Sequence, residues 1–196
     1  MFQPLEATRE AGARTEKTVK TATPGQIASV TGADSATVQV LFAATVAHWR
    51  ASGVRVAGLL AEPDGPPGRT CTAGVLRDID SGRAFQIYFD DTAPGGMMCD
   101  LDASGVEAAC AGLLGQLTKC DVVVLSKFGK LEAARSGLIT AFQAVIDAGT
   151  PLLTSVSSKH REAWKAFVPS AIELPAEAAA IQGWWRGLRV RAGLSC

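Results

Sequence analysis

Apolar residues recur along the chain with two alternating spacings, and this alternation predicts the fold. Short runs of branched apolar residues indicate buried parallel strands. Stretches in which apolar residues return every three or four positions indicate amphipathic helices. The predicted strands are residues 27–30, 54–60, 122–125 and 151–156, with an edge strand at 172–174. The predicted helices are residues 36–52, a segment after Asp102, a segment beginning near Glu132, a short helix after Ser158 and a last helix whose first turn holds Pro175.

An inserted β-hairpin interrupts this alternation. The stretches 71–79 and 83–89 flank Asp80-Ser81-Gly82, which is a hairpin turn signal. We therefore expect an α/β three-layer fold with a mainly parallel sheet and an inserted β-hairpin. Residues 1–25 mix charged and small residues and predict an N-terminal arm that precedes a single domain at 26–196. The arm has no apolar h-region, so we do not expect a secretory signal.

The amino-acid composition gives no support for a nucleic-acid or a membrane partner. The 196 residues include 19 basic and 19 acidic side chains, so the net charge gives no argument for a nucleic-acid partner. No apolar run approaches the roughly 18 residues that would cross a bilayer, so we expect no membrane insertion. The five cysteines contain no C-x-x-C pair. They are typical of reduced thiols in the cytoplasm.

The segment from Asp121 to Glu132 has the pattern of a nucleotide-binding edge without its metal chemistry. An aspartate opens an apolar strand, and polar and glycine residues follow the strand at once. In nucleotide-hydrolysing α/β proteins such a strand ends in an acid that organises Mg²⁺, often followed by a second acid that orients water. Ser126 and Lys127 occupy those two positions here.

The first strand-to-helix turn lies where a P-loop would be, but it lacks most of the residues that define one. The motif G-x-x-x-x-G-K-[ST] uses glycines for backbone approach, lysine for the phosphates and a hydroxyl for Mg²⁺. Counting from Gly32, the last three defining positions hold Thr37, Val38 and Gln39. One interpretation is an ordinary turn. The other is weak anion binding by the amides of Ala33, Asp34, Ser35, Ala36 and Thr37 at a helix N-terminus.

Three segments carry a resemblance to known families: Ser126-Lys-Phe-Gly-Lys-Leu-Glu132, Cys71 before the hairpin, and Cys99-Asp-Leu-Asp102 before a helix. They resemble an uncharacterised bacterial domain family often encoded near molybdate-transport genes. That family is related to the small P-loop nucleoside-triphosphatase family but has degenerate Walker motifs. The resemblance implies a P-loop-NTPase-like sheet and a role in molybdenum handling.

The candidate site combines the first turn with the loop after the 122–125 strand. Ser126, Lys127, Gly129, Lys130 and Glu132 lie where open α/β sheets bind ligands. They could bind a small anionic ligand, either a nucleotide or an oxoanion such as molybdate or phosphate. The alternative is that Lys130 and Glu132 form solvent-exposed or structural ion pairs. Cys71, Cys99 and Asp102 are weak metal candidates, and buried unpaired thiols are the competing interpretation.

Three functions follow from these patterns. The favoured hypothesis is a non-catalytic P-loop-like protein that binds a nucleotide or oxoanion as an accessory to molybdenum handling. A second is a weak Mg²⁺-dependent nucleoside triphosphatase in which Asp34, Asp121 or Glu132 recruits the metal. A third is a homodimeric protein-interaction module that uses the arm or the last helix and binds no ligand.

Overall fold

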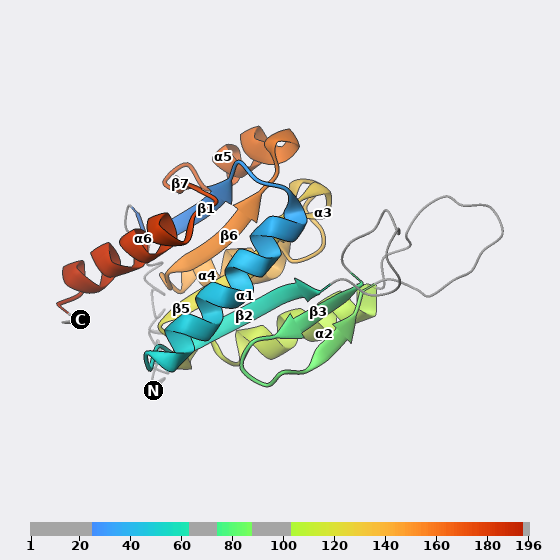
Figure 1. Cartoon of the computed structure of the whole chain (residues 1–196). Helices are drawn as coiled ribbons and strands as arrows, with labels where there is room; N and C mark the ends of the chain where they lie inside the picture. Colours follow the sequence, from blue (N-terminus) through green and yellow to red (C-terminus); the bar gives the residue numbers. More distant parts are fainter. Residues whose placement is uncertain (1–24, 63–73, 88–102, 194–196) are drawn as a thin grey trace, which may run out of the picture.

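The apolar runs of the sequence form strands of one sheet. The computed structural model describes residues 25–62, 74–87 and 103–193, and in these ranges the sheet has seven strands in the order β4-β3-β2-β5-β6-β1-β7 (Figure 1). Strands β2, β5, β6, β1 and β7 are parallel, whereas β2, β3 and β4 form an antiparallel meander at one edge. The strands are β1 (Ile27–Thr31), β2 (Val56–Glu62), β3 (Val75–Asp78), β4 (Ala84–Gln86), β5 (Val122–Phe128), β6 (Leu152–Val156) and β7 (Ile172–Pro175).

Helices cover both faces of this sheet. One core cluster joins α1 and α6 to the sheet, and a second cluster joins α2, α4 and α5 to the opposite face. The helices are α1 (Ser35–Ala51), α2 (Ala103–Leu114), α3 (Lys130–Ala133), α4 (Ile139–Asp147), α5 (Arg161–Phe167) and α6 (Ala178–Arg191), with short 3-10 turns η1 (Leu117–Lys119) and η2 (Ser158–His160). The predicted three-layer, mainly parallel, P-loop-NTPase-like sheet with an inserted hairpin is confirmed.

Strand β5 lies at the centre of the sheet, and this position explains why its first four residues are all apolar. The strand continues to Phe128, so Ser126 and Lys127 belong to the strand and not to the predicted loop after it. Val122 and Val124 pack in the cluster with α1 and α6, while Val123 and Leu125 pack in the cluster with α2 and α4. All four side chains are fully buried. A strand covered on both faces must be apolar on both faces, as the continuous run predicted.

The connections between the strands define a switch point at β1. From β1 the chain crosses through α1, on one face, to β2. From there it returns through β5 and β6 to β7, with α2, α4 and α5 on the other face. The crossover from β1 therefore runs toward β2 with its helix on one face, and the crossover from the neighbouring β6 runs toward β7 with its helix on the other face. In open α/β sheets ligands bind in the crevice outside the carboxyl ends of such strands.

Several predicted boundaries were wrong, for reasons that lie in strand pairing and backbone geometry. The second strand runs from Val56 to Glu62 instead of 54–60, because its last four residues pair with β3. Pro175 does not start the last helix: it ends β7 opposite Thr31, and α6 begins at Ala178 after the N-cap Glu177. The segment after β5 forms two helices, α3 and α4, separated by Gly137 with a positive φ of 63°.

Some predictions fall on residues that the structure does not describe. These are the N-terminal arm apart from Gly25, and the three weak metal candidates Cys71, Cys99 and Asp102. Among the helices of the described ranges, none is both long and apolar enough to span a bilayer.

Candidate functional site

The first turn after β1 is closed by its own carboxylate. Gly32 adopts a positive φ of 92° and leads into Asp34, the N-cap of α1. The Asp34 carboxylate accepts hydrogen bonds from the Thr37 hydroxyl at 2.6 Å and from the Thr37 backbone N–H at 3.0 Å. These bonds, the hydroxyl first, lower the pKa of Asp34. The positive end of α1 is thus already compensated, and an anion at the predicted amides would meet a negative charge.

Ser126 turns its hydroxyl into the sheet. The side chain is buried, its Oγ donates to the Leu59 carbonyl at 3.0 Å, and it also accepts from the Ala61 backbone N–H. The Ser126 carbonyl accepts from the Ser155 hydroxyl at 2.6 Å and from the Gln39 side-chain amide at 3.3 Å. Ser126 therefore links β5 to β2, β6 and α1, and its hydroxyl is engaged with β2 where a hydrolase would need a metal ligand.

Glu132 holds the loop after β5 together. Its buried carboxylate accepts from the backbone N–H of Gly129 at 2.9 Å and from that of Leu138 at 3.0 Å. A side chain at Gly137 would place a Cβ only 2.5 Å from the Glu132 Oε1. Both oxygens are therefore committed to the backbone, and the turn fits tightly around them.

Lys127 and Lys130 are the two positively charged residues of the candidate site. Both side chains are exposed, and neither forms an ion pair with any acid in the described ranges. The stem of Lys127 lies near Gly129, where an added Cβ would be 3.4 Å from the lysine Cε. The hydrogen bond from Gln39 to Ser126 joins the start of α1 to the end of β5. The first turn and the two lysines thus share the carboxyl edge of the sheet.

In the sequence, Gln39 was notable only because it occupies the position at which a P-loop has a serine or threonine. Its Nε2 donates to Ser126, while its Oε1 is buried and has no hydrogen-bond partner among the residues described. A buried acceptor without a donor is unfavourable unless water or a ligand satisfies it. Only its place in the P-loop pattern could have drawn attention to it.

The carboxylates of the magnesium hypothesis do not converge. Asp121 precedes the amino end of β5, while Glu132 follows its carboxyl end, so the two lie at opposite edges of the sheet. Asp121 forms an ion pair with Arg55 at 2.5 Å and also accepts from the Arg55 backbone N–H at 2.8 Å. These hydrogen bonds lower the pKa of Asp121. Within the described part of the chain, no three His, Cys, Asp or Glu residues are grouped to hold a metal.

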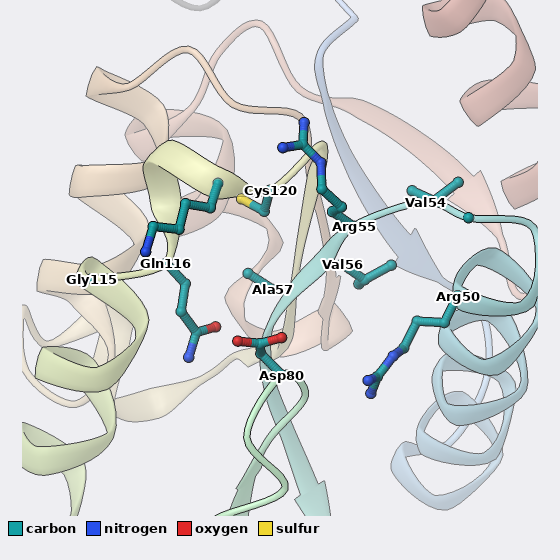
Figure 2. A pocket seen from close by; sticks show the side chains of 11 residues that line it. Arg50, Val54, Arg55, Val56, Ala57, Asp80, Gly115, Gln116 and Cys120 are labelled. Carbon is teal, nitrogen blue, oxygen red and sulfur yellow. The ribbon is translucent and has the colours of Figure 1, made fainter.

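Two cavities of about 460 and 540 Å³ lie at the amino edge of the sheet, opposite the predicted site. Both are lined by Val54 and Arg55, which lie just before β2, and neither includes a residue of the predicted anion site. Figure 2 shows the side chains around the smaller cavity. Sequence reasoning did not anticipate either cavity.

Comparisons with known proteins agree with this fold. The family model described as "Protein of unknown function (DUF2478)" matches residues 27–184. A curated relative, the molybdenum import ATP-binding protein ModC 2 of Bradyrhizobium diazoefficiens, is 33% identical over 138 residues. That alignment covers 69% of this chain but only 15% of the relative's length. No solved structure matches the chain.

Proposed function

We propose, given that the chain belongs to the DUF2478 family, that it is a non-catalytic P-loop-like protein that binds a nucleotide or a small oxoanion at the carboxyl edge of its sheet. The name of the ModC 2 relative supports a place for this chain as an accessory to molybdenum handling, and the absence of a C-x-x-C pair among its five cysteines favours the cytoplasm. Molybdate is the first ligand to test, and phosphate and adenosine triphosphate are the next.

The observation that carries this proposal is a pair of exposed lysines at the carboxyl edge of the sheet. Lys127 and Lys130 are exposed, and no described acid pairs with either. Ligands of open α/β sheets gather at this edge. A charge-assisted hydrogen bond to an oxoanion contributes about 1.5–3 kcal/mol before ordering costs. Two such bonds support a weak site that needs no metal.

The same geometry argues against hydrolysis. Magnesium-dependent phosphoryl transfer needs oxygen ligands for the metal and a group that orients water. Asp34 is bound to Thr37, and Glu132 is bound to the amides of Gly129 and Leu138. The Ser126 hydroxyl is bonded to β2. A bound nucleotide would therefore keep its phosphates intact.

Isothermal titration with molybdate, phosphate and adenosine triphosphate, each with and without Mg²⁺, tests the proposal. Lys127→Ala combined with Lys130→Ala should weaken binding at least about tenfold. The matched control, Lys165→Ala combined with Arg186→Ala, removes two exposed positive charges elsewhere and should bind like the parent. Equal binding by both double variants contradicts the site. Phosphate release at about 1 per second or faster contradicts the non-catalytic assignment.

A further inference from the structure

The smaller cavity at the amino edge of the sheet is lined by charged groups of both signs. It has a volume of about 460 Å³ and lies between the end of α1, the start of β2, the β3–β4 turn and the segment after α2. Its polar lining comes from Arg50, Arg55, Asp80, Gln116 and Lys119, and Figure 2 shows how these elements surround it. The volume is in the range of small-molecule sites.

The buried carboxylate of Asp78 orders two groups on one side of this cavity, the backbone of the turn at Asp80 and the side chain of Gln116. Its Oδ1 accepts from the Asp80 backbone N–H at 3.0 Å, and its Oδ2 accepts from the Gln116 Nε2 at 2.7 Å. The second bond fixes the Gln116 amide, whose Oε1 is buried and unpaired within the described ranges. In Figure 2 this amide oxygen faces the Asp80 carboxylate. The structure thus presents two facing acceptors without a donor between them.

The other charged side chains of the lining are cations. Arg55 is held at the cavity by its ion pair with Asp121, and Arg50 donates from Nη1 to the Ile79 carbonyl at 2.6 Å. Lys119 is exposed and has no acidic partner in the part of the chain that is described. In Figure 2 Arg55 lies on the far side of the cavity from Asp80. Arg55 is therefore separated from the acceptors, whereas Arg50, bonded to the residue that precedes Asp80, lies on the same side as Asp80.

We propose that this cavity binds a small zwitterion of the α-amino-acid type. An ammonium group has three donors and a positive charge, which suit the facing Asp80 carboxylate and Gln116 carbonyl. The carboxylate of the same molecule then pairs with Lys119 and Arg55. A simple anion would pair with the cations but leave the two acceptors without a donor. A simple amine would pair with the acceptors but leave the cations without an anion. This site is separate from the proposed function at the carboxyl edge and does not depend on it.

Thermal shift and alkylation of Cys120 test the proposal on the full chain. Cys120 lines the same cavity and is only partly buried, so a bound ligand should slow its reaction with iodoacetamide. The probe is a mixture of the common amino acids except cysteine, whose thiol would consume iodoacetamide, at about 1 mM each, a concentration that fills sites of weak micromolar affinity. Acetate and ethylamine at the same total concentration serve as probes that carry only one of the two charges. Peptide mass spectrometry follows Cys120 separately from the other cysteines.

The mixture should raise the melting temperature and slow the alkylation of Cys120, whereas acetate and ethylamine should do neither. Asp80→Asn and Lys119→Ala should each abolish both effects, because each removes one of the paired charges. The controls Glu107→Gln and Lys165→Ala change exposed charges elsewhere and should keep both effects, as should Lys127→Ala combined with Lys130→Ala. The proposal is overturned if the mixture has no effect on the parent, or if both effects survive in Asp80→Asn and Lys119→Ala.

Discussion

Replacing Glu132 by alanine should destabilise the protein strongly, because this carboxylate satisfies two buried backbone donors. The Gly129 and Leu138 N–H groups donate to its two oxygens at 2.9 and 3.0 Å. A buried donor that loses its acceptor costs about 1–3 kcal/mol, so the pair predicts a loss of about 2–6 kcal/mol in the free energy of unfolding. Glu132→Gln keeps one acceptor and turns an NH₂ group toward the other donor, so it should lose an intermediate amount.

Urea denaturation followed by circular dichroism measures these losses. Glu107→Ala is the control, because Glu107 is exposed on α2 and its removal should change the free energy by less than about 0.5 kcal/mol. The reasoning is refuted if Glu132→Ala is as stable as this control. It is also refuted if the parent hydrolyses nucleotide and Glu132→Gln loses that activity at unchanged stability, since Glu132 would then be catalytic.

Three further substitutions test other parts of the structure. Gly58→Ala should lose more than about 4 kcal/mol or fail to fold, because its Cβ would lie 1.9 Å from the Val124 carbonyl oxygen at a φ of +140°; a native circular dichroism spectrum with an unchanged urea midpoint would argue against this packing. Asp121→Asn should lose about 1 kcal/mol at neutral pH. Arg55 lowers the pKa of Asp121 in the folded state. The stability that the pair contributes is therefore fully present when the pH is above the pKa of Asp121 in the unfolded chain, about 3.9. It is lost as the pH falls through the lower pKa of Asp121 in the folded protein. Urea midpoints measured from pH 7 downward should therefore converge for parent and variant at acid pH, and a constant difference would be inconsistent with this coupling. Asp34→Ser keeps an N-cap acceptor but removes the negative charge, so titration should show tighter phosphate binding at nearly unchanged stability; weaker binding would mean that the carboxylate assists the ligand.

The sequence predicted the strands well because burial on both faces leaves a continuous apolar signal. Val122 to Leu125 illustrates this, since each side chain packs in one of the two core clusters. The ends of the strands were harder to predict, because pairing decides them. Strand β2 extends to Glu62 only because β3 pairs with its last four residues, and nothing local to Glu62 marks it as strand.

The shared location of the candidate residues at one edge of the sheet was predictable, but their hydrogen bonding was not. In a parallel sheet the carboxyl ends of β1 and β5 lie at the same edge. The sequence therefore predicted that Gly32 and Lys127 lie in the same region. Whether Asp34 and Glu132 face a ligand or the backbone depends on distances of a few ångströms that no spacing encodes. The amino-edge cavity was missed because Asp80 and Gln116 are joined only through Asp78, and no local motif connects them.

The most direct test of the central claim is the position of a bound oxoanion. Tungstate, a heavy analogue of molybdate, can be located by its anomalous scattering in a crystal of the full chain grown without phosphate or sulfate. We expect tungstate at the carboxyl edge, in contact with Lys127 and Lys130 and without Mg²⁺. Tungstate bound only at the amino edge, or absent from a crystal soaked well above the dissociation constant measured in solution, would contradict the account.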